Sequence, residues 1–130
     1  MIPVCEPTLI GNEKKYVEQC IDTNWISSSG SFLEDFEKKF SKFCNAKHGV
    51  SCSNGTTALH LALAALGIGK GDEVIVPDFT IIAVANAVLY TGATPVFVDS
   101  EMKTWNMDTE RIEEKITGKT KAIIAMHTYG

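Results

Sequence analysis

The sequence lacks the long apolar runs and the basic surface that would direct it to a membrane or to nucleic acid. No apolar run approaches the roughly 20 residues of a membrane span, and the Met1-Ile2-Pro3 start has no basic segment leading into an apolar core. The formal net charge is −4, with 12 basic and 16 acidic residues, which does not favour polyanionic partners. We therefore expect a soluble, cytoplasmic protein with neither nucleic acid nor membrane as its partner.

Cysteine is present but lacks the spacing of a disulfide framework or a metal site. The four cysteines form no C-x-x-C pair and are expected to be buried or half-buried thiols: Cys5, Cys20, Cys44 and Cys52. Cys44, His48 and Cys52 could suggest zinc, but Asn45 to Gly49 is typical of a turn, so the three would not share a helix face. We expect no metal site.

Hydrophobic spacing predicts two helices in the first fifty residues. Asn12 to Ile21 carries an apolar stripe, and a second helix begins at Ser31, where Glu34 completes a capping box. Phe36 and Phe40 continue the apolar face of that second helix. A chain of 130 residues with 45% hydrophobic content fits one domain or part of one, without a second domain.

The rest of the chain alternates short apolar runs with helical stretches. Strands are expected at Gly49 to Cys52, Glu73 to Val76, Thr94 to Val98 and Ala122 to Met126, and helices at about Thr57 to Leu66, Ile82 to Tyr90 and Thr109 to Ile116. This order predicts an α/β fold with a mainly parallel sheet and helices on both faces. Ligands should then bind beyond the carboxyl ends of the strands, at Ser53 to Thr57, Pro77 to Thr80, Asp99 to Glu101 and His127 to Gly130.

Local signals mark where these helices begin and end. Gly67 and Gly92 stand where a helix C-terminus needs glycine. Asp108 is a candidate N-cap, with Met107 and Ile112 placed as a hydrophobic staple.

The strongest local signal for a ligand is the turn Ser53-Asn54-Gly55-Thr56-Thr57. It joins an expected strand to a helix N-terminus, where unpaired N–H groups and the helix dipole favour an anion. Gly55 lets an anion approach the backbone, and the threonine hydroxyls add donors. A phosphate site and a ligand-free capped Asn-Gly turn remain equal alternatives on these residues alone.

Three other readings have weaker support from the residues. Gly67 to Gly71 follows a helix instead of a strand, unlike a dinucleotide loop, and Gly118-Lys119-Thr120 lacks the first glycine of a P-loop. Cysteine or serine hydrolysis could use Cys52 with His48, His60 or His127, but Gly49 to Ser53 lacks the closing glycine of a nucleophile elbow. His60, within an apolar helix, is typical of a packed histidine.

The chain resembles the DegT/DnrJ/EryC1/StrS sugar aminotransferases over nearly its whole length. The resemblance rests on SNGTTALHLALAALGIGKGDEVIVPDFT and on IPVCEPTLIGNE, WISSSGSFLEDFEKKF, GATPVFVD and ITGKTKAIIAMHTYG. It implies a pyridoxal-phosphate (PLP) enzyme of polysaccharide biosynthesis. Residues 1–130 would be the N-terminal part of the large domain of the fold type I PLP-dependent transferases.

The resemblance also assigns residues to sites. Asn54, Gly55, Thr56 and Thr57 would bind the cofactor phosphate, and Ile81 occupies the position where relatives stack an aromatic ring on the pyridine. An isoleucine can cover that ring but cannot stack on it. In relatives the stretch with Trp25, Ser27 and Ser28 lies near the active-site mouth and the substrate, although a buried tryptophan and helix-capping serines would explain these residues equally well.

The reaction implied is amino transfer from glutamate to a keto group of a nucleotide-linked deoxy sugar, in a homodimer when the protein is full length. The Schiff-base lysine and the aspartate at the pyridine nitrogen are expected beyond Gly130, and Asp99 is not that aspartate. The chain alone is therefore predicted to be inactive. A non-catalytic truncated product or phosphate-binding fragment, and a PLP-dependent sugar dehydratase of the same fold, remain alternatives.

A hypothesis about stability follows from the sheet order of the family. The strand neighbouring Gly49 to Cys52 would come from the end of the domain, so these residues are expected to be stable only within a longer chain.

Overall fold

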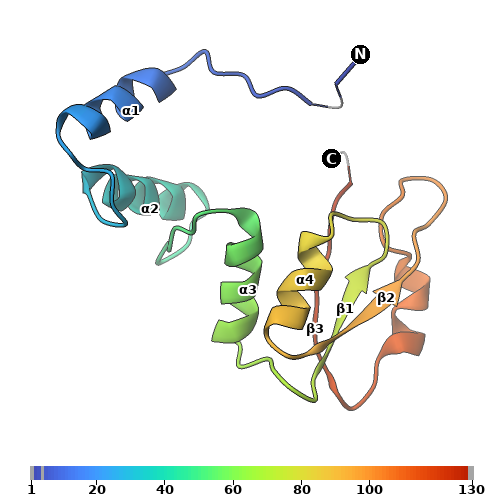
Figure 1. Ribbon diagram of the computed structural model, residues 1–130. Coiled ribbons are helices and arrows are strands. Elements are labelled where there is room, and N and C mark those ends of the chain that lie inside the picture. The colour runs from blue at the N-terminus through green and yellow to red at the C-terminus, as the bar shows by residue number, and fades with distance from the viewer. Residues whose placement is uncertain (1, 4, 129–130) are drawn as a thin grey trace. The chain divides into compact units, whose positions relative to one another are not determined.

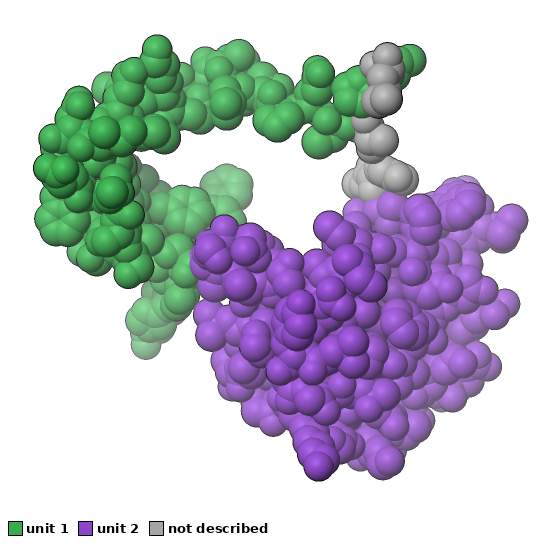
Figure 2. All heavy atoms as spheres, in the orientation of Figure 1, with its two compact units in different colours: residues 1–51 green, residues 52–130 purple. Residues whose placement is uncertain are grey.

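The computed structural model describes residues 2–3 and 5–128. The chain divides into two compact units, residues 1–51 and residues 52–130 (Figure 2). Each unit has its own secondary structure and is described separately. No helix among the described residues is long and apolar enough to span a membrane.

The first unit contains two α-helices, α1 at Glu13–Asp22 and α2 at Ser31–Phe43 (Figure 1). Both predicted helices are confirmed, but the predicted capping box at Ser31 and Glu34 is wrong. Gly30 is the N-cap, with φ of 149°, and its carbonyl accepts hydrogen bonds from the Leu33 and Glu34 amides at 3.1 and 3.2 Å. Because Ser31 lies inside the first turn, its hydroxyl is not placed to cap the helix.

The predicted strand at Gly49 to Cys52 is wrong, since these residues pair with no described strand. Their polar groups bind α2 instead. The Glu37 carboxylate accepts hydrogen bonds from the amide and the hydroxyl of Ser51, both at 2.8 Å. A Cβ at Gly49 would lie 2.8 Å from the Glu37 carbonyl oxygen, so the backbone there lies directly against the helix.

The second unit contains a three-stranded parallel sheet with the order β2-β1-β3. Its strands are β1 at Glu73–Pro77, β2 at Thr94–Val98 and β3 at Thr120–Ile123. The strand and sheet predictions are confirmed for β1 and β2, whereas β3 begins and ends earlier than the predicted Ala122 to Met126. The β1–β3 register shifts between Glu73 and Val74, and this irregularity lies next to the early start of β3.

Side chains of β1 alternate between two apolar cores, one on each face of the sheet. Val74 and Val76 pack with Leu63 of α3 (Gly55–Ala65) and Val88 of α4 (Ala83–Tyr90). Ile75 packs on the opposite face, in a cluster with Val98 and Met107. In Figure 1, α3 and α4 lie on one side of the sheet and the short helices after β2 on the other. The predicted α/β fold with helices on both faces is confirmed.

The predicted α-helix at Thr109 to Ile116 is wrong, because the segment forms two 3₁₀ turns. These are η1 at Thr109–Arg111 and η2 at Glu113–Lys115. Asp108 caps the first turn by accepting the Glu110 amide at 3.1 Å, which confirms the predicted N-cap. Ile112 packs beside Met107, as the predicted staple requires, but Ile116 is 53% exposed. A longer helix would thus bury little more apolar surface.

Two further predictions concern glycines and cysteines. Gly67 and Gly92 follow α3 and α4 with φ of 72° and 83°, which confirms them as helix-ending residues. The expected burial of the thiols is confirmed only for Cys20, which is half-buried, and is wrong for the exposed Cys5, Cys44 and Cys52.

Candidate functional site

The turn before α3 is built by two side chains that cap each other. Asn54 Oδ1 accepts the Thr57 amide at 3.0 Å. Thr57 Oγ1 accepts the Asn54 amide at 3.3 Å and donates to the Asn54 carbonyl at 2.8 Å. Helix α3 therefore begins at Gly55, ahead of the predicted start at Thr57. The Gly55 and Thr56 amides fall in the first turn, where N–H groups have no intrahelical acceptor.

The turn leaves its backbone open at Gly55. A Cβ built at Gly55 would meet no atom within 4 Å, so nothing in the described structure fills the space in front of this residue. The amide and hydroxyl of Thr57 are engaged with Asn54, whereas the Gly55 and Thr56 amides have no hydrogen-bond acceptor among the described residues. The N-terminal end of an α-helix also carries partial positive charge, which favours an anion here.

An open pocket of about 540 Å³ connects the turn to the loop after β1. Its wall combines the first turn of α3 with the start of α4, and the lining residues are Gly55, Thr56, Ala58, Leu59, Ile81 and Ala83. Ile81 is 63% exposed, so its side chain presents an apolar surface rather than filling the core. The structure brings Gly55, Thr56 and Ile81 together in one pocket, while Asn54 and Thr57 shape the turn behind them.

A second, smaller pocket of about 160 Å³ lies beyond the ends of β1 and β2. Its aromatic wall is the Phe79–Trp105 pair, whose ring centroids are 5.3 Å apart. Glu101 organises the adjoining turn by accepting hydrogen bonds from the Thr104 hydroxyl and the Lys103 amide, and these bonds lower the pKa of its carboxyl. Sequence reasoning missed Trp105, whose position after an expected strand was the available signal.

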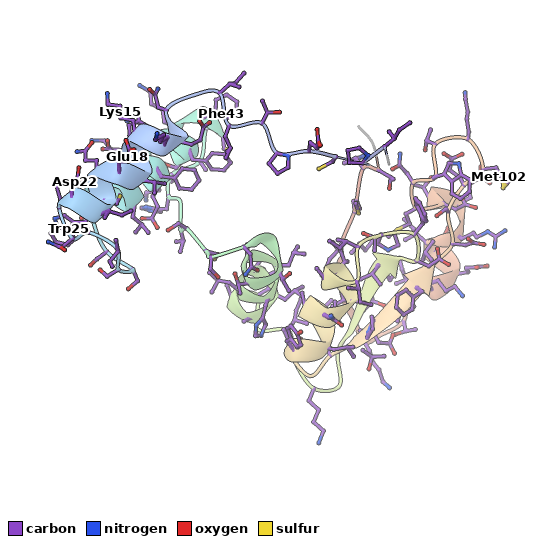
Figure 3. The ribbon with its side chains drawn as sticks, turned by 45° about the horizontal axis from the view of Figure 1, so that its top comes forward. Lys15, Glu18, Asp22, Trp25, Phe43 and Met102 are labelled. Atoms are coloured by element: carbon purple, nitrogen blue, oxygen red, sulfur yellow. The ribbon has the colours of Figure 1, made fainter. Side chains whose placement is uncertain are left out.

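The three candidate substrate residues lie in the first unit. Trp25 is 57% exposed just beyond the end of α1 (Figure 3), so the alternative of a buried tryptophan is wrong. Trp25 and Ser27 line a pocket of about 510 Å³ at the loop between α1 and α2, which Ser28 does not line. The Ser27 hydroxyl lies 3.4 Å from that of Ser29 instead of capping a helix.

Other candidate chemistry has a structural explanation. The half-buried His60 packs against Tyr90 in an edge-to-face arrangement with centroids 5.8 Å apart, as expected for a packed histidine. Within residues 2–3 and 5–128, no three His, Cys, Asp or Glu side chains gather closely enough to hold a metal ion.

Residues 7–130 match the DegT/DnrJ/EryC1/StrS aminotransferase family. The chain belongs to this family. It is 57% identical over 129 residues to the GDP-perosamine synthase of Caulobacter vibrioides, a match that covers 99% of this chain and 35% of that protein. The chain thus spans about a third of the length of this curated relative.

The branch of the family was also predicted from two segments of the sequence. Thr23 to Ser28 and Asn54 to Thr57 predict a resemblance to GDP-perosamine synthases, and the 57% identity to the Caulobacter vibrioides protein over 99% of this chain confirms that resemblance.

Solved structures of two similar proteins share the fold. An aminotransferase from Psychrobacter cryohalolentis has a TM-score of 0.88 and 38% identity, covering 95% of this chain and 32% of its own. The NtdA protein of Bacillus subtilis, solved with its bound cofactor PMP, has a TM-score of 0.83 and 38% identity, covering 90% of this chain and 27% of its own. The fold is that of the N-terminal part of the large domain of fold type I PLP-dependent transferases.

Proposed function

We propose that this chain supplies the phosphate-binding part of a pyridoxal-phosphate site in an aminotransferase acting on nucleotide-linked keto-deoxy sugars. The observation that carries the proposal is that Gly55 and Thr56, at the N-terminus of α3, line one open pocket with Ile81. In this proposal, both units belong to one cofactor-binding domain.

The residues of the pocket fit the chemistry of this cofactor. Pyridoxal phosphate has an anionic phosphate at one end and a flat aromatic ring at the other. The helix N-terminus at Gly55 offers amides and unfilled space to the phosphate. Ile81 and Leu59 offer apolar surface to the aromatic ring. When bound, the cofactor supplies the electron sink that amino transfer needs.

The roles of this chain's own residues follow from their contacts. The Gly55 and Thr56 amides bind the phosphate oxygens, and the mutual cap of Asn54 and Thr57 holds those amides in place. Ile81 covers one face of the ring without stacking on it. In the first unit, Trp25 and its neighbouring serines Ser27 and Ser28 contribute to substrate binding.

The proposal extends to the substrates and the assembly. The amino acceptor is a nucleotide-linked keto-deoxy sugar and glutamate is the amino donor. Identity of 57% across 99% of the chain to a GDP-perosamine synthase supports the acceptor class. The homodimer and the cytoplasmic location expected from the sequence are part of the same proposal.

A negative charge introduced at Gly55 tests the phosphate site. Gly55→Asp places a carboxylate beside the phosphate amides, and the open space around Gly55 lets the side chain fit without a clash. We expect at least a tenfold loss of PLP affinity, about 1.4 kcal/mol, with folding unimpaired because an acidic residue suits a helix N-terminus. Absorbance titration of the full-length protein with PLP measures the change.

The matched control for this test is Gly55→Ala, which adds a methyl group to the same open space. It should bind PLP more tightly than Gly55→Asp, because it adds bulk but no negative charge. If Gly55→Asp and Gly55→Ala bind PLP with equal affinity, the cofactor phosphate does not bind at this turn.

A second experiment addresses the catalytic lysine. None of the lysines in this chain matches the family's Schiff-base position, and Lys14, Lys38 and Lys119 are all exposed. Borohydride treatment of the 130-residue chain with PLP should therefore trap no adduct at a unique lysine. Mass spectrometry of a proteolytic digest makes this measurement, and a single fully modified lysine would contradict the expectation.

A further inference from the structure

The segment after β3 is held from two sides at the carboxyl edge of the sheet. The Ile124 amide donates to the Ile75 carbonyl at 2.9 Å, which continues the β1–β3 pairing past the end of β3. Two residues later, the Thr80 hydroxyl donates to the sulfur of Met126. The Thr128 amide then donates to Asn106 Oδ1 at 2.8 Å.

The hydrogen bond between Thr128 and Asn106 joins the segments that follow the two outer strands of the sheet. Asn106 belongs to the loop after β2, and Thr128 follows β3, while β1 lies between those strands. The β1–β2 pairing continues to the end of β1, where the Asp78 amide donates to the Val98 carbonyl at 3.0 Å. The Asn106–Thr128 bond therefore bridges the flanking segments beyond the last ladder bond of the central strand.

Asn106 is itself fixed by the loop that carries it. Its Nδ2 donates to Thr104 Oγ1 at 2.9 Å, and its carbonyl accepts the Glu101 amide at 2.9 Å. The next residue, Met107, is buried and pairs with Ser100 in an isolated β-bridge. Because its Nδ2 is engaged within the loop, the amide oxygen of Asn106 points toward the Thr128 amide.

Residues 124–128 contact groups that adjoin the candidate cofactor pocket. Thr80, which contacts Met126, is adjacent in sequence to Ile81, and Ile81 lines the pocket. Ile124 packs against the same apolar core as Leu59, which also lines the pocket. Displacement of residues 124–128 would therefore move groups that support the pocket on two sides.

We propose that Asn106 is a positioning residue for the cofactor site. It holds residues 126–128 through the Thr128 amide, and that segment in turn supports the loop of Thr80 and Ile81. This inference rests on the proposed function, since it assumes that the pocket at Gly55 binds PLP. Asn106 lines neither that pocket nor the smaller one at Trp105, so its effect is transmitted through the segment it holds.

The test uses three variants of the full-length protein. Asn106→Leu removes the acceptor at similar volume, Asn106→Asp keeps an oxygen at the same position, and Asn86→Leu makes the same change at a half-buried asparagine of α4. Hydrogen exchange at the Thr128 amide reports the bond directly, and PLP titration reports the site.

We expect Asn106→Leu to speed Thr128 exchange and to weaken PLP binding, each by roughly fivefold or more. Asn106→Asp should restore both values to near those of the wild type, and Asn86→Leu should change neither. If Asn106→Leu does not fold, Asn106→Ala replaces it and removes the same acceptor with a smaller side chain.

Two results would overturn the inference. The first is Thr128 exchange that Asn106→Leu leaves unchanged, and the second is faster exchange with unchanged PLP affinity. Failure of Asn106→Asp to rescue also counts against it. Failure of the wild-type protein to bind PLP is a different outcome, because it rejects the proposed function itself.

Discussion

Asn54 and Thr57 cap each other across the first turn of α3, with the side chain of each accepting the backbone amide of the other at 3.0 and 3.3 Å. This reciprocal pair starts the helix at Gly55. The consequence is that Gly55 and Thr56 occupy the first turn of α3 and line the pocket, whereas Thr57 does not line it.

Loss of the Asn54 cap should destabilise the protein. In Asn54→Ala the Thr57 amide loses its side-chain acceptor, and such a loss costs about 1 kcal/mol, within a range of roughly 0.5 to 2. Urea denaturation followed by circular dichroism measures the difference. Asn54→Asp is the control, because it keeps an acceptor at the same place and should retain most of the stability. Equal loss in both variants would contradict the capping role.

An aromatic ring at position 81 should strengthen cofactor retention. Ile81 lines the pocket and is 63% exposed, so Ile81→Phe can place a ring there without disturbing the core. Offset stacking adds about 0.5 to 1.5 kcal/mol, which slows PLP dissociation by roughly twofold to tenfold.

Ile82→Phe is the matched control for this prediction, since Ile82 is also exposed but does not line the pocket. To measure dissociation, the PLP-loaded variant is diluted into a related protein in its apo form, which captures the released PLP. The decay of the bound-PLP absorbance then gives the dissociation rate. If the two phenylalanine variants release PLP at the same rate, Ile81 does not contact the ring.

The glycine that ends α4 is required by its backbone conformation. Gly92 has φ of 83°, which costs an L-residue about 1 to 2 kcal/mol. Gly92→Ala should lower the free energy of unfolding by that amount, although its Cβ would meet no atom closer than 3.6 Å. Gly118→Ala, at a glycine with open space and no positive φ, should have little effect. Thermal unfolding of the two variants side by side makes the comparison.

Acidification should release Ser51 from α2. Hydrogen bonds from the Ser51 amide, and then from its hydroxyl, lower the pKa of the Glu37 carboxyl. The stabilisation is therefore present above the ordinary carboxyl pKa and is lost as the pH falls through the lowered value. Exchange at the Ser51 amide should speed up in this acidic window beyond its intrinsic pH dependence.

Glu37→Gln is the control for the acid response. Its amide oxygen can still accept the Ser51 amide but does not titrate in this range. The additional acceleration should therefore disappear in this variant. Persistence of the acceleration in Glu37→Gln would assign it to another group.

Much of the second unit was predictable from local sequence. The apolar runs at β1 and β2 predict strands because both faces of a parallel sheet are buried, and the glycines at Gly67 and Gly92 predict the helix ends because of their positive φ. At Gly55 the same local rules left an anion site and a ligand-free capped turn as equal alternatives, and the structure shows that Gly55 and Ile81 line one pocket.

The incorrect predictions arose where local patterns compete with tertiary contacts. Ser31 with Glu34 has the spacing of a capping box, yet Gly30 supplies the helix start through its carbonyl. The apolar pattern of residues 49–52 predicts a strand, but the Ser51 amide donates its hydrogen bond to the Glu37 carboxylate instead of to a neighbouring strand. In each case a backbone amide, that of Glu34 or of Ser51, donates to a different acceptor from the one that the sequence pattern predicts.

The sequence by itself determined the family, the α/β alternation and the helix ends at Gly67 and Gly92, because these depend on short-range spacing and on backbone conformations open mainly to glycine. Only the tertiary structure decided that Ile81 shares a pocket with Gly55 and that Asn106 holds Thr128 across the end of β1. These contacts join residues separated by more than twenty positions, and such pairs are set by how strands and loops pack, which no local pattern records.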